Sequence, residues 1–411
     1  MTSSSGYVTR IFSDPKCFWI VQGILIPLFV SSAWLTSNLV NYKPLVPELN
    51  NTPRVIRPEF DYPFVVSDSQ LQSVLFKIRP RFKKSPPKIN FIDHALRLWG
   101  RIPQIESESY SGKQLYRMLT DHPTYRSQYG TAARPLLKVS AHGIEVTTRE
   151  TRTSVSHVDH LMGTLAEIGT PLSYEVKTPE LEGRVGDILN HAVRNFRLNQ
   201  REYEWTALAL ALYIKDDQTW YSADGQELDF DRIAERTMRQ SQPQGVCYGQ
   251  HRLYTLAMLL RINQQLASED QSEILSPGKV EKINDYLLDM TRRFYKSQSA
   301  VGYWDGNWHD AESNIPDPRT DELSRRLLAT GHALEWWAMA PQKLHPPRET
   351  IVRASQWLAK TIIEMDDKSI EANYTFLTHS ARSLVLWRGK FAEEMDPQEL
   401  TDPEIRISMK Q

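Results

Sequence analysis

The strongest constraint on the fold is an alternation between two kinds of predicted helix. Three stretches are apolar on every side: 205–213, 253–260 and 327–340. Three others are amphipathic and charged: 229–239, 280–296 and 348–360. A helix that is apolar all round is buried, whereas an amphipathic helix exposes one face to solvent. The alternation therefore predicts a layer of inner helices surrounded by outer ones.

The predicted inner helices begin at regular intervals. His160 and Trp205 are 45 positions apart, and His251 follows Trp205 by 46. His332 and His379 are 47 positions apart. A period in the forties is the length of two helices with their turns, which is the unit of a helical-hairpin repeat.

Two longer gaps in this pattern contain insertions. The 81 positions before His332 include a long loop at about 297–320. The 66 positions before His160 include 136–148, which alternates, is rich in β-branched residues and predicts a β-hairpin. We therefore expect an all-α (α/α)6 toroid of helical hairpins with a small inserted β-hairpin. A superhelical solenoid with the same repeat is the alternative.

The helix boundaries follow from apolar periodicity and from Gly, Pro and Asp clusters between the elements. The expected helices are 91–100, 112–120, 155–168, 179–198, 202–215, 228–241, 247–265, 277–297, 321–340, 347–365 and 374–388, with a short one at 67–78. The expected organisation is a tail at 1–17, a membrane segment at 18–40, a Pro-rich linker at 41–88, the toroid domain at 89–390 and a tail at 391–411.

The segment 18–40 is uncharged, and its first thirteen residues are strongly apolar. About 20 apolar residues span a bilayer. Because apolar residues continue past the small residues at 31–33, a single-pass signal anchor is favoured over a cleaved signal peptide, for which 31–33 would be the cleavage site. In both cases the membrane is the expected partner of this segment, and the main domain is expected to be extracytoplasmic.

Charge and cysteine content exclude several classes of protein. The chain has 49 Lys and Arg against 50 Asp and Glu, so it lacks the basic excess of a nucleic-acid-binding protein. Cys17 and Cys247 are its two cysteines and cannot build a disulfide framework. The sequence assigns no cofactor and no metal.

Histidines recur at the predicted starts of the inner helices. In a closed ring these helices are parallel, so their N-termini gather on one face, where N–H groups without partners favour anions. The histidines expected at this mouth are His94, His157, His160, His251, His332 and His379. The two ends of the ring are also alike, in Phe91-Ile-Asp-His94-Ala-Leu-Arg97 and Phe376-Leu-Thr-His379-Ser-Ala-Arg382.

The stretch Gly245-Val-Cys-Tyr-Gly-Gln-His251 places Cys247 and His251 four positions apart. On one helical face these two side chains could share a Zn²⁺ ion, with His332 as a third ligand. Alternatively, the helix N-terminus and His251 could lower the pKa of Cys247 and make the thiol nucleophilic. The third interpretation is a small buried residue without chemistry, and it is the one favoured.

Gln298-Ser-Ala-Val-Gly302-Tyr-Trp304 resembles the Gln-x3-Gly-x-Trp repeat motif of triterpene cyclases, α/α toroids related to protein prenyltransferases. In that family the motif ties the end of an outer helix to its neighbour. The resemblance therefore implies a toroid. The Asp-rich signature of those cyclases is missing, because Asp216-Asp217 and Asp366-Asp367 have different surroundings.

Thr330-Gly-His332-Ala-Leu-Glu335 resembles the Gly-His-x-x-Glu element of N-acylglucosamine epimerase-like (α/α)6 barrels. This resemblance implies that His332 transfers protons and that Glu335 is its neighbour on the helix. The predicted catalytic residues are His251, His332, Glu335, His379 and Arg382, with Arg382 holding an anion. The predicted substrate contacts are Tyr248, Trp304, Trp308, Asp310 and Trp336.

Three functions remain open. The first is an extracytoplasmic enzyme that acts on a carbohydrate. The second is a membrane-tethered scaffold module whose concave surface binds a peptide, lipid or partner protein. The third is an isoprenoid-processing toroid, which the missing acidic signature makes the weakest of the three. The sequence leaves open whether the protein is an enzyme.

Overall fold

The computed structural model describes residues 15–39, 46–82, 86–101, 109–149, 152–311 and 321–395. Two compact units are present, one from Met1 to Leu45 and one from Val46 to Gln411. The described residues are mostly helical, with three small two-stranded sheets.

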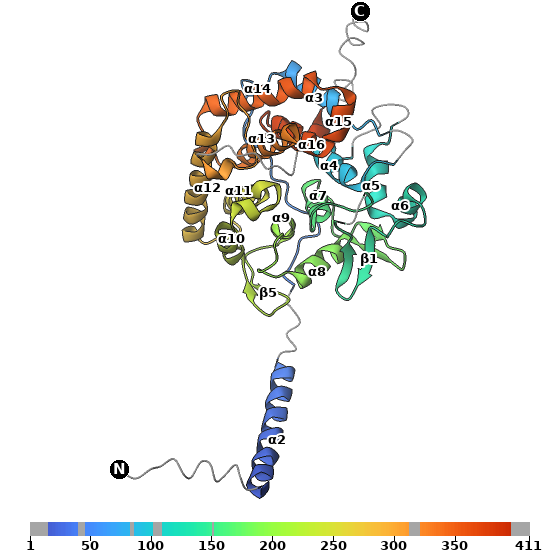
Figure 1. Cartoon of the computed structure of the whole chain (residues 1–411), viewed down its shortest axis with the longest axis vertical. Helices are drawn as coiled ribbons and strands as arrows, with labels where there is room; N and C mark the ends of the chain where they lie inside the picture. The colour runs from blue at the N-terminus through green and yellow to red at the C-terminus, as the bar shows by residue number, and fades with distance from the viewer. Residues whose placement is uncertain are drawn as a thin grey trace, which may run out of the picture. The chain divides into compact units, whose positions relative to one another are not determined.

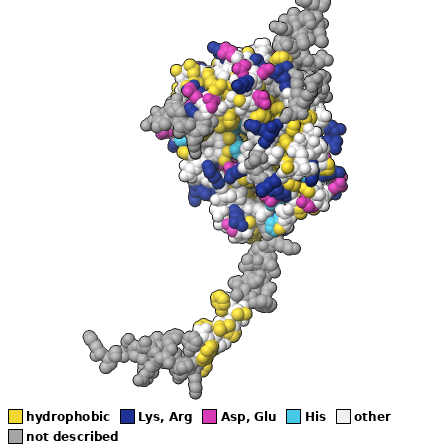
Figure 2. All heavy atoms as spheres, turned by 45° about the vertical axis from the view of Figure 1, so that its right-hand side comes forward, with side chains coloured by type: hydrophobic (Ala, Val, Ile, Leu, Met, Phe, Trp, Pro, Cys, Tyr) yellow, Lys and Arg dark blue, Asp and Glu magenta, His cyan; other side chains and the backbone are white. Residues whose placement is uncertain are grey.

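The first unit contains one helix, α2 (Pro15–Leu39), with Pro27 inside it. Large apolar side chains between Trp19 and Val30 lie on the surface of this helix, where Trp19 is 71% and Phe29 77% exposed (Figure 2). Among the residues the structure describes, no helix combines the length and the apolarity needed to cross a membrane.

The second unit is built from helices of 6 to 21 residues. They are α3 (Asp68–Ile78), α4 (Ile89–Trp99), α5 (Gly112–Thr120), α6 (His122–Tyr129), α7 (His160–Glu167), α8 (Val185–Asn195), α9 (Glu204–Tyr213), α10 (Phe230–Arg239), α11 (Gln250–Ser268), α12 (Pro277–Ser297), α13 (Glu322–Met339), α14 (Arg348–Glu364), α15 (Asp367–Ala372) and α16 (Tyr374–Leu386). Most begin and end within three residues of the expected bounds. The exceptions are the starts of α7 and α8, which lie later, and α6 and α15, which were not expected.

Six of these helices form an inner set in which each packs against the next. The order of contact is α4, α7, α9, α11, α13 and α16, and α16 packs in turn against α4. Helices α5, α8, α10, α12, α14 and α3 lie outside them (Figure 1). The inner set includes α9, α11 and α13, which lie at the three stretches that the sequence identified as apolar all round.

Burial separates the two sets as the alternation predicted. Every residue of α9 is buried. In α10, the buried residues are Phe230, Ile233, Ala234 and Thr237, spaced i, i+3, i+4 and i+7. That spacing describes one face of a helix, so α10 exposes its other face while α9 is surrounded.

The predicted β-hairpin is confirmed as β1 (Leu137–Ser140) paired with β2 (Gly143–Val146). A Cβ atom on Gly143, whose φ is +134°, would lie 2.1 Å from the Asp187 carbonyl oxygen, so the turn requires glycine where it meets α8. The sequence did not reveal two smaller hairpins, β3 (Glu175–Lys177) with β4 (Glu182–Arg184) and β5 (Trp220–Tyr221) with β6 (Glu227–Leu228). Their strands are too short for alternation to show.

The Pro-rich segment before α4 lies along the domain. The Asn50 amide donates to the Tyr213 carbonyl at 2.7 Å, and the Tyr62 amide donates to the Trp387 carbonyl at 2.8 Å. Ser67 caps α3, and α3 packs against α14 and α16. The compact unit starts at Val46, and residues 46–82 of the predicted Pro-rich linker are part of its packing.

Gln298 ties two outer helices together at the end of α12. Its Nε2 donates to the Gly302 carbonyl and to the Thr350 carbonyl on α14, both at 2.9 Å. Its Oε1 accepts from Arg353 of α14 at 2.6 Å. A Cβ on Gly302 would lie 2.4 Å from the Arg353 carbonyl oxygen, so glycine permits this close approach. These contacts correspond to the structural role expected of the Gln-x3-Gly-x-Trp motif.

Candidate functional site

Six histidines meet among the inner helices, and we call them the histidine cluster: His94, His157, His160, His251, His332 and His379. His160 and His251 lie at helix starts as expected, whereas His332 lies in the middle of α13. The His94 and His160 rings are stacked at 4.3 Å, and the His332 and His379 rings are 3.8 Å apart. His251 lies 5.0 Å from His332 and 5.2 Å from His157 between ring centroids. The predicted convergence of histidines is therefore confirmed.

Burial keeps the cluster uncharged. Five of the six side chains are buried, and His157 is half-buried. Burial lowers the pKa of His332 to about 4. Burial, followed by neighbouring histidines, holds the pKa of His251 and His379 well below the ordinary value. At neutral pH these imidazoles carry lone pairs, the form that binds metal ions.

Two of the histidines are oriented by the backbone of their own helices. His94 Nδ1 lies 2.8 Å from the Asn90 carbonyl oxygen, and His332 Nδ1 lies 2.9 Å from the Leu328 carbonyl oxygen. A carbonyl only accepts hydrogen bonds, so Nδ1 carries the proton in both neutral rings. Nε2 is consequently the unprotonated nitrogen of His94 and His332.

Two others are oriented by buried carboxylates. His160 Nδ1 lies 2.6 Å from Asp93 Oδ2, and His379 Nδ1 lies 2.8 Å from Glu335 Oε2. Thr164 donates to the other oxygen of Asp93 at 2.7 Å. Burial raises the pKa of Asp93 to about 6, which still leaves it ionised at neutral pH. Partners of this kind fix the tautomer of metal-ligating histidines.

The Nε2 atoms of His251 and His332 lie within hydrogen-bonding distance, so an Nε2–H of His251 would donate to the unprotonated His332 Nε2. His251 Nε2 and His332 Nε2 are 3.1 Å apart, and His160 Nε2 is buried without a hydrogen-bond partner. Two nitrogen ligands of a tetrahedral Zn²⁺ are separated by about 3.4 Å, since each Zn–N bond is about 2.0–2.1 Å long. The separation of His251 and His332 is therefore close to that of a ligand pair.

The cluster contains two sets of three histidines whose ligand atoms lie within 4.8 Å of one another. One set is His94, His160 and His379, and the other is His251, His332 and His379. All five residues are buried. His379 is shared by both sets and stands at the centre of the arrangement.

Cys247 belongs to a third set, with His157 and His251. Its Sγ lies 4.0 Å from His157 Nε2. Helix α11 begins only at Gln250, and Cys247, Tyr248 and Gly249 have φ values of +49°, +57° and +78°. The expectation that Cys247 and His251 share a helical face is therefore wrong, and a left-handed loop brings the two side chains together instead.

Burial, followed by neighbouring carboxylates, raises the pKa of the Cys247 thiol well above its ordinary value. This contradicts the alternative in which the helix N-terminus and His251 activate the thiol by lowering its pKa. Glycine suits position 249, because its φ is +78° and a Cβ there would lie 2.9 Å from the Gln242 carbonyl oxygen.

Below the histidine cluster lies a second buried group, which we call the charged layer: Arg97, Glu167, Tyr254, Glu335 and Arg382. Arg97 bonds Glu167 at 2.5 Å and Glu335 at 2.7 Å. Arg382 bonds Glu335 at 2.5 Å and Glu167 at 3.0 Å, and Tyr254 donates to Glu167.

The charged layer changes the interpretation of two predicted residues. Burial opposes ionisation of Glu335, but Arg97 and Arg382 outweigh it and lower the pKa of this carboxyl. Glu335 accepts from His379 and from both guanidiniums, whereas its expected neighbour His332 bonds a backbone carbonyl. Arg382 was expected to hold an anion of the substrate, and it is occupied by two carboxylates of the protein.

The predicted substrate-binding aromatics lie away from the histidines. Trp304, Trp308 and Trp336 are at most 1% exposed and surround Phe294, which stacks on Trp308 at 3.9 Å. Tyr248 is half-buried, and its carbonyl accepts from Trp308 Nε1 at 3.1 Å. In this structure these rings contribute to packing.

Asp310 is also separate from the histidine cluster. It is exposed and lines a hollow of about 420 Å³ together with His309, Arg293 and Tyr286. None of the cluster histidines lines that hollow. Of the ten predicted site residues, the structure brings His251, His332, Glu335, His379 and Arg382 together.

A pocket of about 550 Å³ adjoins the histidine cluster. His94, His157, Cys247 and His379 lie in its wall. Its rim includes Lys88, Phe91, Arg152 and Phe376. The pocket therefore borders three histidines of the cluster.

Several residues of the site were missed or undervalued in the sequence. Asp93 gave no signal, because its partner His160 is 67 positions away. Arg97 did give a signal in the sequence. His94 and Arg97 repeat the spacing of His379 and Arg382 in two similar segments of the chain.

No family model, no curated protein and no solved structure matches this chain. The chemistry of the site is therefore inferred from its own residues.

Proposed function

We propose that the second unit is an (α/α)6 toroid. The closed order of contacts among α4, α7, α9, α11, α13 and α16 supports this architecture, as does the outer position of the six amphipathic helices. A solenoid would leave its first and last inner helices apart, whereas α4 and α16 are in contact here.

We propose that the histidine cluster binds a divalent transition-metal ion and that the protein is a metal-dependent enzyme. The observation that carries this proposal is the orientation of His94, His160, His332 and His379, each with Nδ1 at an acceptor and Nε2 left unprotonated. Neutral imidazoles without a thiolate or carboxylate among them suit Zn²⁺, Cu²⁺, Fe²⁺ or Ni²⁺.

Such an ion lowers the pKa of a bound water and polarises a substrate oxygen, which suits hydrolysis or hydration. The protein would supply the rest of the centre. Asp93 and Glu335 hold two imidazoles in place, and the guanidiniums of Arg97 and Arg382 balance the charge of Glu335 and Glu167. The pocket of about 550 Å³ admits a substrate of one or two sugar rings.

Carbohydrate remains the proposed substrate class, now with different aromatic contacts. Phe91 and Phe376 line the pocket, whereas Trp304, Trp308 and Trp336 do not. The alternatives are a scaffold module and an isoprenoid-processing toroid, and neither of them requires unprotonated Nε2 atoms to converge.

We also propose that α2 anchors the protein to a membrane. The exposed apolar side chains between Trp19 and Val30 support this, because such surface is stable only when it is covered. Carbonate extraction of membranes from expressing cells tests the anchor. Release of the full-length chain into the soluble fraction would contradict it.

The metal proposal is tested by elemental analysis of the full-length protein and by titration of Zn²⁺ and Co²⁺ after chelation. We expect at least one equivalent of metal and a chelator-sensitive melting temperature. An ion at 100 times its Kd stabilises a protein by about 2.7 kcal/mol. Bound Co²⁺ should also show visible bands typical of nitrogen ligands.

His379→Ala should abolish binding by the two sets made of histidines alone, since His379 belongs to both of them. The matched control is His345→Ala, because His345 Nε2 is bonded to the Trp337 and Ala340 carbonyls far from the cluster. A wild-type protein that binds no metal, with a melting temperature unaffected by Zn²⁺ or chelator, would overturn the proposal and favour the scaffold.

A further inference from the structure

A second hollow adjoins the pocket above the histidine cluster. It has a volume of about 520 Å³, within the range of small-molecule sites. Lys88, Phe91 and Arg152 line both hollows. A ligand seated in the second hollow would therefore lie beside the pocket that borders the histidines.

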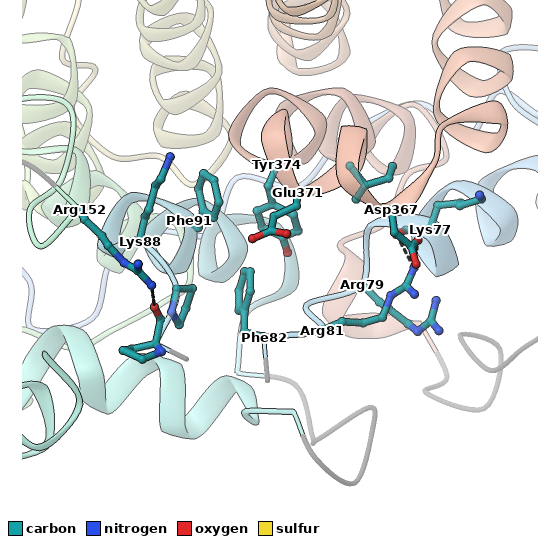
Figure 3. Close-up of a pocket in the computed structure, with 13 residues that line it drawn as sticks. Lys77, Arg79, Arg81, Phe82, Lys88, Phe91, Arg152, Asp367, Glu371 and Tyr374 are labelled. Atoms are coloured by element: carbon teal, nitrogen blue, oxygen red, sulfur yellow. Dashed lines mark hydrogen bonds and ion pairs between the residues drawn. The ribbon is translucent and has the colours of Figure 1, made fainter. Parts of the chain in front are cut away.

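The walls of this hollow are strongly basic. Five cationic side chains line it against two carboxylates: Lys77, Arg79, Arg81, Lys88 and Arg152 against Asp367 and Glu371. Figure 3 shows Lys88 and Arg152 at one side, Lys77, Arg79 and Arg81 at the other, and aromatic rings between them. The excess of positive charge favours an anionic ligand.

Local partners account for the cations on the side away from the histidines. Arg81 lies 3.4 Å from Asp367, and the Lys77 ammonium donates to the Met365 carbonyl at 2.9 Å. The Arg79 guanidinium stacks on Phe76 at 3.6 Å. These side chains are held by the protein itself.

On the side shared with the histidine pocket, Lys88 differs from the three cations that the protein holds. Lys88 is exposed, and its ammonium lies 5.1 Å from the centre of the Phe91 ring. Over the described ranges of the chain, no carboxylate forms an ion pair with Lys88. Arg152, which donates to the Pro86 carbonyl, lies beside it (Figure 3).

An aromatic wall completes the hollow. The rings of Phe82 and Tyr374 are 5.0 Å apart, and those of Phe91 and Tyr374 are 5.6 Å apart. Flat apolar faces of this kind contact the face of a ring-shaped ligand. Ring faces together with a cation select a molecule that carries both a ring and a negative group.

We infer that this hollow binds an anionic sugar, with its ring against Phe91 and Tyr374 and its carboxylate or phosphate on Lys88 and Arg152. The inference rests on the proposed function, because it names the substrate class of the same site. The anionic group is held at the junction of the two hollows, beside the pocket that borders the histidine cluster.

The test is calorimetric titration of the metal-loaded full-length protein at low salt. The probes are glucuronate, glucose 6-phosphate, inorganic phosphate and glucose. We expect the two charged sugars to bind at least about tenfold more tightly than glucose, because a charge-assisted contact is added. The stronger of the two identifies the anion, and inorganic phosphate should bind more weakly because it has no ring.

Lys88→Gln should weaken binding of the charged sugars about tenfold and leave metal content unchanged. The control is Lys282→Gln, an exposed lysine of α12 that lines neither hollow. Equal binding of glucose and the charged sugars, or equal binding by wild type and Lys88→Gln, would overturn the inference. Lys88-dependent binding of charged sugars by a protein without metal would support it while refuting the metal proposal.

Discussion

The histidine cluster and the charged layer are two buried polar groups on the same inner helices. His94 and Arg97 are three positions apart on α4, as are His379 and Arg382 on α16. In the charged layer, two guanidiniums face two carboxylates and a tyrosine hydroxyl. In the histidine cluster, imidazoles face imidazoles, with ring centroids 3.8 to 5.2 Å apart in neighbouring pairs.

The difference teaches how to separate a structural polar group from a ligand site. Buried polar atoms are nearly always hydrogen-bonded, and buried charges are paired. The charged layer satisfies both rules. In the histidine cluster, Nδ1 of four rings lies at an acceptor, and His160 Nε2 is buried without a hydrogen-bond partner. The same helices would therefore stabilise the fold at one level and, on the proposed function, supply metal ligands at the next.

The largest effect on stability is expected from a substitution that breaks the charged layer. Glu335→Ala leaves Arg97 and Arg382 with one carboxylate between them, and removing one member of a buried ion pair costs about 3–5 kcal/mol. Urea unfolding in the presence of chelator measures this loss without a contribution from metal.

Arg232→Gln is the control for Glu335→Ala. Arg232 pairs with Glu227 at the surface, so its loss should cost less than about 1 kcal/mol. If Glu335→Ala is destabilised no more than Arg232→Gln, the charged layer does not stabilise the fold as described here.

A smaller effect is expected when the histidine cluster is changed instead of the charged layer. Asp93→Asn keeps an oxygen that accepts from His160 Nδ1 but removes the negative charge. Loss of such a partner typically weakens metal binding 10–100-fold, or about 1.4–2.7 kcal/mol. Competition with a chromophoric chelator measures the affinity.

Asp310→Asn is the matched control, since Asp310 lies in a different hollow. The chelated Asp93→Asn protein should unfold at nearly the wild-type urea concentration. If Asp93→Asn instead keeps the wild-type Zn²⁺ affinity and unfolds at a lower urea concentration, Asp93 has a structural role like that of the charged layer.

The smallest effect concerns the outer helices, which belong to neither buried group. Gln298→Ala removes the contacts with Gly302, Thr350 and Arg353, and because these are half-exposed the cost is about 1 kcal/mol. Metal affinity should not change. The control is Gln264→Ala, because Gln264 is exposed on α11. A shift in Zn²⁺ affinity in Gln298→Ala but not in Gln264→Ala would show that the outer helices influence the histidine cluster.

Much of the fold could be predicted because helix periodicity is a local property. The bounds of α5 and α12 agree with the sequence to the residue. Short elements escaped, since α15 has six residues and β5 has two, too few to show a period. The convergence of the histidines was expected from their repeat spacing, because a repeat of two helices with their turns places successive inner helices side by side.

The roles of individual side chains could not be predicted in the same way. Trp304 and Trp308 lie in a loop rich in aromatic and acidic residues, a composition that suits a ligand-binding rim. In the structure they pack on Phe294 of the preceding helix and are buried. Aromatic side chains contribute to both environments, and only their neighbours distinguish them.

By itself the sequence determined most of the helices and which of them are buried, because each depends on residues a few positions apart. Tertiary structure alone decided that Nδ1 of His160 and His379 is held by Asp93 and Glu335, and that Lys88 and Arg152 line the pocket beside the cluster. His379 and Glu335 are 44 positions apart in the chain, and His160 and Asp93 are 67 apart, yet folding brings each pair within hydrogen-bonding distance. Folding likewise brings Lys88 and Arg152 into the wall of one pocket. The proposed chemistry depends on these distances, and they exist only in the folded protein.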